Sequence, residues 1–235
     1  MMIDFSSNKL SEGNIEEFYL KVKQASNKQI NNIWLGVQDY SLVFDLQKKI
    51  HNDRINDNIK DVVLMLEHDH VYTLGKNADS NHILSVENEI VKSDRGGDVT
   101  YHGPGQLVCY PILDLNMYKK SITWYVNLLQ ESILSILSNY KIDAIKKNSP
   151  YTGVWVNDDK IAAIGIRLSK WISMHGFSVN INTDLNYYNK IIPCGIFDYG
   201  ITSIEELIKK RIKVIDFANA IGEVLSDKLI ERAAS

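Results

Sequence analysis

The sequence contains little cysteine, with only Cys109 and Cys194 among its 235 residues. Two cysteines are too few for a disulfide framework, and no Cys-x-x-Cys spacing indicates structural zinc. The N-terminal residues Met1 to Gly13 lack the apolar stretch of a signal peptide, and no run of about 18 apolar residues could span a bilayer. These absences predict a cytoplasmic protein that is not inserted in a membrane.

An excess of charge of either sign is also absent. The chain has 26 Lys and Arg against 29 Asp and Glu, which gives a net charge of -3, and it has no long basic run. Because binding to a phosphate backbone requires a basic surface, nucleic acid is not an expected partner. With 45% hydrophobic and 23% charged residues, the composition is that of soluble globular proteins.

Internal repeats, low-complexity linkers and abrupt changes of composition are absent between residues 30 and 230. The length is compatible with one domain. The sequence therefore predicts an N-terminal lead-in over residues 1–30 and a single domain over residues 31–232.

The hydrophobic pattern predicts both strands and helices. Apolar and β-branched runs predict strands over residues 33–37, 62–66, 71–74, 107–115, 154–156, 161–168 and 177–181. Helical spacing predicts helices from Tyr40 to Ile50, after Ser121, after Ser203 and from Phe217 to Leu229. The turn-prone residues 157–159 join two of the strands into a hairpin that places Lys160 where a strand leaves it. The expected fold is α+β, a single domain with a mixed, largely antiparallel sheet flanked by helices.

The segment from Arg95 to Gln106 concentrates four glycines, one proline and several functional side chains between two predicted strands. Glycine allows positive φ and a close approach of the backbone to a ligand, so the segment could wrap a substrate. A tight turn without function is the simpler alternative. The segment has neither the P-loop pattern nor G-x-G-x-x-G, so it does not indicate a phosphate-binding loop.

Cys194 stands between Pro193 and Gly195, a setting that restricts the chain and leaves the sulfur accessible. A thiol needs a nearby cation or donor to become a good nucleophile, and Lys160, His102 and His175 are all candidates for that partner. The alternative is a buried, inert cysteine. Cys109, inside an apolar run, illustrates that alternative.

Histidines occur in two further contexts. His102 and His175 each precede a glycine, which suits a pocket wall but also an ordinary hydrogen-bonded histidine. His68 and His70 flank Asp69, but the spacing supplies no third ligand, so no metal is expected.

Taken together, these segments resemble the octanoyl-[acyl-carrier-protein]:protein octanoyltransferases, or lipoyl(octanoyl) transferases, of the biotin and lipoate protein ligase superfamily. The resemblance runs from about Trp34 to Glu206. It rests on motifs in a fixed order, namely Glu67-His68 with Tyr72-Thr73, Arg95 to Gln106, Gly153-Val154-Trp155, Lys160-Ile161 with Gly165, His175-Gly176 and Pro193-Cys194-Gly195. Asp69-His70 departs from the proline that many relatives carry after Glu-His.

The resemblance implies a fold like the biotin/lipoate ligase catalytic domain and two catalytic residues. Cys194 would carry the octanoyl group as a thioester, and Lys160 would assist it. Acyl-substrate contacts are implied for three segments: Arg95, Gly96, Gly97, Asp98, Val99, Thr100, Tyr101 and His102; Ala163, Ile164 and Gly165; and His175, Gly176, Phe177 and Ser178.

The resemblance also implies the partners. The donor is acyl carrier protein, which bears the acyl group on its phosphopantetheine, and no other cofactor or metal is expected. The acceptors are the lipoyl domains of oxoacid dehydrogenase and glycine cleavage complexes, and the enzyme itself is expected to be a monomer. Lysines that could steer an acidic carrier include Lys119, Lys120, Lys146 and Lys147, although paired lysines are usually only solvated surface.

Two other functions compete with this interpretation. An ATP-dependent lipoate or biotin protein ligase shares the expected fold but needs no cysteine nucleophile. A catalytically silent member would only bind lipoyl domains or acyl carrier protein. The presence of both Cys194 and Lys160 favours the transferase over each of them.

Overall fold

The computed structural model describes residues 2–85, 89–193 and 199–233. Its helices are α1 (Ile15–Ala25), α2 (Tyr40–Ile55), α3 (Ile122–Asn139), α4 (Ile204–Ile208) and α5 (Val214–Ala233). Its strands are β1 (Ile3–Asp4), β2 (Ile30–Gln38), β3 (Asp61–His68), β4 (Val71–Leu74), β5 (Glu89–Lys92), β6 (Val99–His102), β7 (Gln106–Ile112), β8 (Ile145–Lys147), β9 (Gly153–Val156), β10 (Asp159–Ser169), β11 (Ile172–Asn180) and β12 (Gly200–Ile201). Short 3-10 turns are η1 (Ser80–His82), η2 (Leu115–Met117) and η3 (Leu185–Lys190).

Two sheets organise these elements. Within the described residues, nine strands form a large sheet in the order β1-β2-β3-β7-β11-β10-β9-β8, with β12 pairing with β10. The pairs β1·β2, β2·β3 and β10·β12 are parallel, and the others in this sheet are antiparallel. A smaller sheet has the order β5-β4-β6. The predicted α+β fold with a mixed, largely antiparallel sheet flanked by helices is confirmed.

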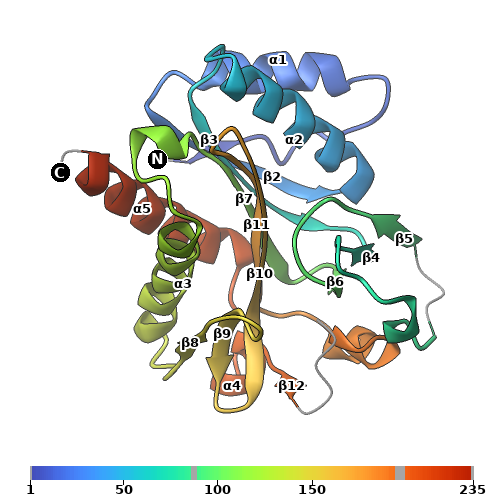
Figure 1. Cartoon of the computed structure of the whole chain (residues 1–235). Helices are drawn as coiled ribbons and strands as arrows, with labels where there is room; N and C mark the ends of the chain where they lie inside the picture. Colours follow the sequence, from blue (N-terminus) through green and yellow to red (C-terminus); the bar gives the residue numbers. More distant parts are fainter. Residues whose placement is uncertain (1, 86–88, 194–198, 234–235) are drawn as a thin grey trace.

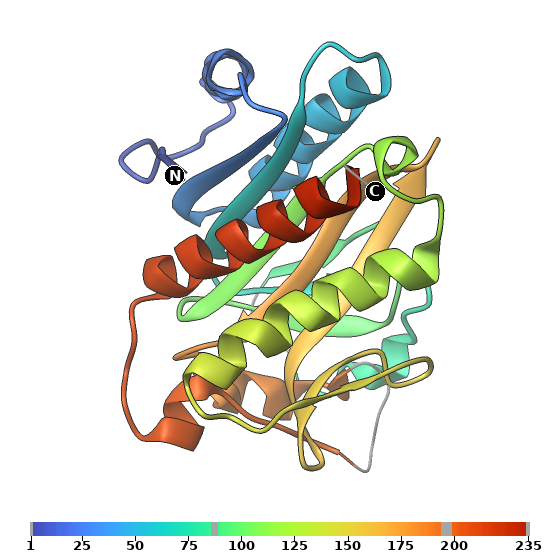
Figure 2. The ribbon, with the colours of Figure 1, turned by 90° about the vertical axis from the view of Figure 1, so that its left-hand side faces the viewer.

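Helices cover both faces of the large sheet. Helices α1 and α2 lie on one face, and α3 and α5 lie on the other (Figures 1 and 2). Side chains of a strand alternate between the two covered faces, which explains why residues 62–66 of β3 are all apolar. Val62, Leu64 and Leu66 pack on the α2 side, while Val63 and Met65 pack on the α5 side.

The first thirty residues are part of this packing, although the sequence pattern predicted only a lead-in there. Strand β1 pairs with β2, and α1 buries Phe18, Tyr19 and Val22 beside α2. The apolar face of α1 is short and interrupted by charged residues, so its periodicity alone gives a weak helical signal.

Cys109 lies in the middle of β7 and is fully buried. Burial raises the pKa of its thiol well above the usual range, because the thiolate would lose its hydration. The expectation that Cys109 is buried is confirmed. No helix in the described part of the chain is both long and apolar enough to cross a bilayer.

Candidate functional site

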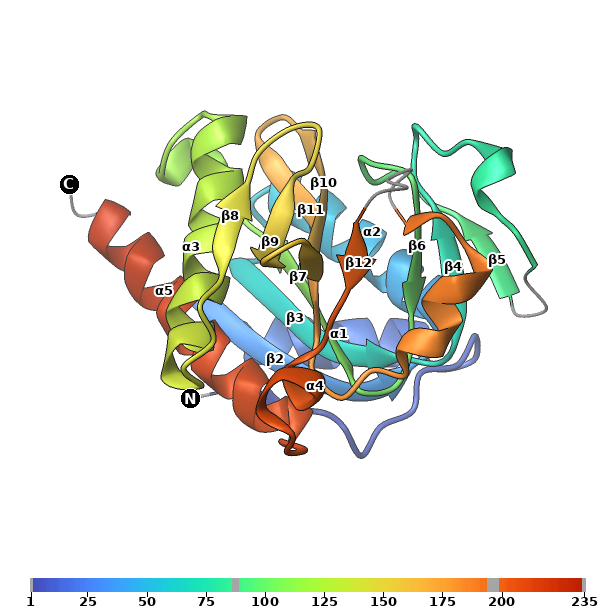
Figure 3. The same ribbon diagram turned by 90° about the horizontal axis from the view of Figure 1, so that it is seen from below.

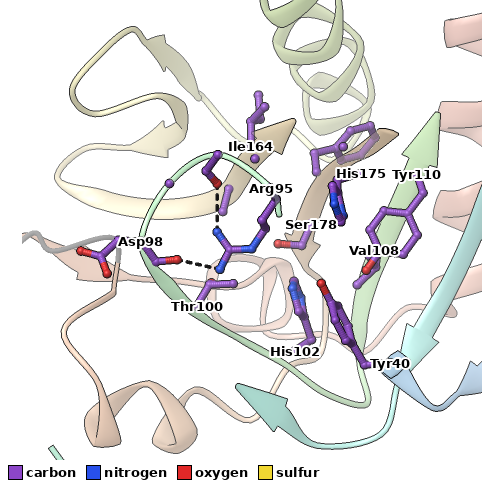
Figure 4. A pocket seen from close by; sticks show the side chains of 16 residues that line it. Tyr40, Arg95, Asp98, Thr100, His102, Val108, Tyr110, Ile164, His175 and Ser178 are labelled. Carbon is purple, nitrogen blue, oxygen red and sulfur yellow. Dashed lines mark hydrogen bonds between the residues drawn. The ribbon is translucent and has the colours of Figure 1, made fainter. Parts of the chain in front are cut away.

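The glycine-rich segment connects the small sheet to the large one, and Arg95 holds it in place. Arg95 is 8% exposed, and its guanidinium donates to the carbonyl oxygens of Thr73, at 2.7 Å, and Asp98, at 2.7 Å. It also donates to the Gly96 carbonyl oxygen at 3.1 Å and to the Thr73 hydroxyl oxygen. Figure 4 shows the guanidinium inside the curve of this loop. Arg95 therefore fixes the loop backbone from within.

Gly165 allows the loop to approach the sheet closely, and Gly176 allows β11 to lie against its neighbour β7. A Cβ added to Gly165 of β10 would stand 2.9 Å from the Gly96 carbonyl oxygen. A Cβ added to Gly176 of β11 would stand 2.2 Å from the Cys109 carbonyl oxygen, which no side chain tolerates. Only glycine fits at Gly176. Residues 163–165 of β10 and 175–178 of β11 form the floor of a cavity under the loop.

The loop, the floor and the start of α2 enclose a pocket (Figure 4). Its lining contains most of the acyl contacts implied by the resemblance: Arg95, Gly96, Gly97, Asp98, Thr100, His102, Ala163, Ile164, Gly165, His175, Gly176, Phe177 and Ser178. The remaining lining residues, Tyr40, Val108 and Tyr110, were not predicted. Tyr40 comes from the first turn of α2, so no local motif links it to the loop.

Val99 and Tyr101 do not line this pocket. Residues 99–102 form strand β6, whose side chains alternate. Thr100 and His102 face the pocket, whereas Val99 and Tyr101 pack with Tyr72 in a separate buried cluster. The structure thus places Val99 and Tyr101 behind the wall of this pocket.

His102 is a neutral imidazole at the wall of the pocket. The Gln106 side-chain nitrogen donates to Tyr101 and Asn180, so its oxygen faces Nδ1 of His102 at 2.6 Å and accepts the proton there. Burial is the main cause that lowers the pKa of His102 to about 3. The same cause lowers the pKa of His68, whose ring lies 5.8 Å from that of His102, to about 4. Both side chains are therefore uncharged at neutral pH.

His175 and Asp94 form a second polar group at the pocket. Nε2 of His175 lies 2.6 Å from a carboxylate oxygen of Asp94, and Arg167 contacts the other oxygen at 2.5 Å. Burial lowers the pKa of His175, although the Asp94 hydrogen bond opposes this. The hydrogen bond from His175 is the main cause that lowers the pKa of Asp94. These contacts orient the imidazole, which is 1% exposed.

Lys160 is 4% exposed and lines a smaller, adjoining pocket. Thr100, Ala163 and Ser178 line both pockets, so the two cavities share a wall. Pro193, the residue before Cys194, also lines the Lys160 pocket. Cys194 and Gly195 lie outside the described residues. His102 and His175 both line the larger pocket and do not line the Lys160 pocket, so the structure places Lys160 apart from the two histidines.

Other residues considered from the sequence have ordinary contacts. His68 uses Nδ1 toward the Gln38 carbonyl oxygen and Nε2 toward the Tyr110 hydroxyl. Nδ1 of His70 contacts the Tyr101 hydroxyl. The N–H of Gly96 donates to the Ile166 carbonyl oxygen at 3.0 Å. No group of three or more potential metal ligands occurs among the residues that the structure describes.

Changing Arg95 to Lys is expected to lower the free energy of unfolding by about 2 kcal/mol, because a lysine ammonium cannot span the carbonyl groups that the guanidinium fork satisfies. Urea unfolding followed by circular dichroism measures the change. Arg211→Lys is the matched control, since Arg211 is exposed and pairs with Glu205 on the surface. Equal stability of the two variants would show that Arg95 does not fix the loop.

Similarity to known proteins identifies the class of protein to which this chain belongs. Residues 39–226 match the lipoyl protein ligase A/B catalytic domain. A structure from the lipoylation system of Thermoplasma acidophilum, a bi-partite lipoate protein ligase with its E2 lipoyl domain, has a TM-score of 0.61 at 15% identity and covers 78% of each chain. Biotin protein ligase from Aquifex aeolicus has a TM-score of 0.52 at 15% identity, over 86% of this chain and 70% of its own. At such identities, these two structures establish the shared fold.

A close sequence relative identifies the family within this class. The octanoyltransferase of Caldicellulosiruptor saccharolyticus is 40% identical over 203 residues, which cover 83% of this chain and 86% of the relative. The chain therefore belongs to the octanoyltransferase family of lipoyl protein ligase A/B catalytic domains.

Proposed function

We propose that this protein transfers an octanoyl group from acyl carrier protein to the target lysine of a lipoyl domain, through a thioester on Cys194. The proposal draws on the octanoyltransferase relatives and on the E2 lipoyl domain that accompanies the Thermoplasma ligase. The main observation in support of the proposal is that Lys160 and Pro193 line one pocket, which adjoins the larger pocket under the glycine-rich loop. By this arrangement a buried lysine lies next to the residue that precedes the proposed nucleophile.

The same geometry supports Lys160 as the partner of the thiol. A cation beside a cysteine favours its thiolate. His102 cannot supply that charge, because its pKa is about 3. His175 is engaged with Asp94 at another wall of the larger pocket. Lys160 is the candidate that shares a pocket with Pro193.

The proposed reaction consists of two half-reactions. In the first, the Cys194 thiolate attacks the donor thioester, a new S–C bond forms, and the phosphopantetheine thiol leaves with a proton from the Lys160 ammonium. In the second, the amine of the acceptor lysine attacks the acyl-cysteine, an amide bond forms and the Cys194 thiolate leaves. The neutral Lys160 amine takes the proton that the attacking nitrogen loses.

The larger pocket is the proposed site for the acyl chain. Ala163, Ile164 and Phe177 offer apolar contact, and Gly165 and Gly176 also line this pocket. Each added methylene changes the free energy of burial by only about 0.8 kcal/mol, so neighbouring chain lengths should compete with octanoyl. The substrate-binding role of these residues is part of the proposal.

The donor thioester supplies both the acyl group and the driving force, so the proposed reaction uses no metal and no cofactor of its own. The phosphopantetheine belongs to the acyl carrier protein. We place the enzyme in the cytoplasm as a monomer that meets its carrier and the lipoyl domains of oxoacid dehydrogenase or glycine cleavage complexes only transiently.

Intact-mass measurement after incubation with octanoyl acyl carrier protein tests the proposal. The natural chain should gain one octanoyl group that hydroxylamine removes, and Cys194→Ala should gain none. Cys109→Ala is the matched control and should still be acylated, because Cys109 is buried in β7. A natural chain without an adduct would exclude covalent transfer; acylation of a lipoyl domain that then required ATP would indicate a ligase, and no acylation at all would indicate a binding-only protein.

A further inference from the structure

The indole ring of Trp155 lies beneath the Lys160 side chain. Trp155 belongs to β9, and its Cα pairs directly with that of Lys160 on the neighbouring strand β10. Nζ of Lys160 stands 4.8 Å from the centroid of the ring. This distance is within the range of a cation–π contact, and tryptophan is the strongest partner for such a contact.

Groups around the Trp155 ring restrict the conformation of the Lys160 side chain. A Cβ added to Gly153 would stand 3.4 Å from Cε of Lys160 and 3.5 Å from Nε1 of Trp155. The lysine stem and the edge of the indole thus pack together over the bare backbone of Gly153. Main-chain pairing holds Lys160 on its other side, where β12 runs parallel to β10 and the N–H of Thr202 donates to the Lys160 carbonyl oxygen at 3.1 Å.

The ring itself is fixed in orientation. Its Nε1–H donates to the Tyr151 carbonyl oxygen at 2.9 Å, and the Tyr199 ring packs edge-on at 5.1 Å between centroids. Trp155 is 1% exposed, so a water molecule has little access to the ring. Cation–π attraction is stronger where the groups are shielded from solvent.

A second ammonium approaches the same ring from β8. Nζ of Lys147 stands 4.4 Å from the Trp155 centroid and 4.4 Å from the Tyr199 centroid. Lys147 was considered above as a lysine that steers a carrier, but only 22% of its side chain is exposed. Its position indicates an aromatic site that receives ammonium groups from both neighbouring strands, with Trp155 between them.

We propose that Trp155 is a positioning residue, which holds the Lys160 ammonium by cation–π attraction at the pocket that Pro193 lines. The proposal rests on the role of Lys160 in the proposed function. Trp155 does not line either pocket of the site, so it acts through Lys160 and not by contact with substrate. Loss of the attraction should slow the chemical steps and leave donor binding unchanged, which lowers kcat and preserves KM.

Fluorinated tryptophan at position 155 tests this directly. Each fluorine weakens the negative face of the ring and leaves its shape nearly unchanged, so folding is not at issue. We expect kcat to fall stepwise from tryptophan to its mono-, di- and trifluoro forms, by about tenfold to thirtyfold at the end of the series, or about 1.4 to 2 kcal/mol. The same series at Trp124 of α3 is the matched control and should leave kcat unchanged.

A double-mutant cycle separates this inference from the proposed function. Trp155→Leu should slow acylation in the natural chain and have no further effect in Lys160→Ala. An equal effect in both backgrounds, or a flat fluorine series while Lys160→Ala is strongly impaired, would overturn the role of Trp155 and leave the proposed function intact. Full activity of Lys160→Ala would instead overturn the role given to Lys160, and the inference with it.

Discussion

Replacing Lys160 with alanine is expected to lower the rate of octanoyl transfer about a thousandfold, within the range that general acid–base groups contribute. Both halves of the proposed reaction need Lys160, first as an ammonium beside the thiolate and then as the amine that takes a proton. Single-turnover acylation by octanoyl acyl carrier protein, and transfer from the acylated enzyme to a lipoyl domain, should therefore both slow. Quenched-flow sampling with intact-mass detection measures each half separately.

Two controls distinguish lost chemistry from lost structure. Lys21→Ala removes an exposed lysine that pairs with Glu17 on α1, and it should retain the natural rate. Ethylamine added to Lys160→Ala should recover part of the rate, because a free amine can enter the space that the side chain leaves. Rates within threefold of the natural chain in both halves would show that Lys160 has no part in proton transfer.

Lowering the pH from 7 to 5 is expected to reduce the free energy of unfolding by about 4 kcal/mol through His68 and His102 alone. His68 is 0% exposed and His102 6% exposed, and their pKa values are about 4 and about 3 in the folded chain. In the unfolded chain both pKa values return to about 6.5. Below that pH the two histidines are protonated in the unfolded state but remain neutral in the folded state. At pH 5 each histidine then contributes about 2 kcal/mol to the loss, and the loss continues as the pH approaches the folded values.

Urea unfolding at several pH values measures how the free energy of unfolding changes with pH. His102→Asn is the informative variant, because its amide nitrogen can replace Nδ1 as the donor to Gln106 and carries no titratable proton. Its stability should fall only about half as steeply between pH 7 and 5. A natural chain whose stability is flat over this interval would contradict the burial of two neutral histidines.

Local sequence patterns predicted most of the large sheet because its strands are buried on one or both faces. They predicted only the second part of β11, from residue 177. The first part contains Ser173 and His175, which look unlike a buried strand but find partners far away in the sequence. The Ser173 hydroxyl donates to Pro111, and the His175 N–H is satisfied by Gln47. No local pattern records such partners.

The candidate site was predicted in the same uneven way. Motifs identified the loop and both floor strands, because each carries glycines and polar residues in a recognisable order. Tyr40 and Asp94 were missed, since their contacts with His102 and His175 arise only in the folded chain. The strand β6 was hidden within a glycine-rich segment, so the alternation that turns Val99 and Tyr101 away from the pocket was not anticipated.

The burial of Cys109 has a practical consequence for labelling. A thiol with no exposure and a raised pKa is inert to alkylating reagents while the chain stays folded. The natural sequence has only one other cysteine, so the stoichiometry of rapid alkylation under native conditions counts Cys194 alone. Under the proposed mechanism, a thiol titration of the unmodified protein doubles as a titration of active sites, and an acyl substrate that blocks it can be recognised without a radioactive label.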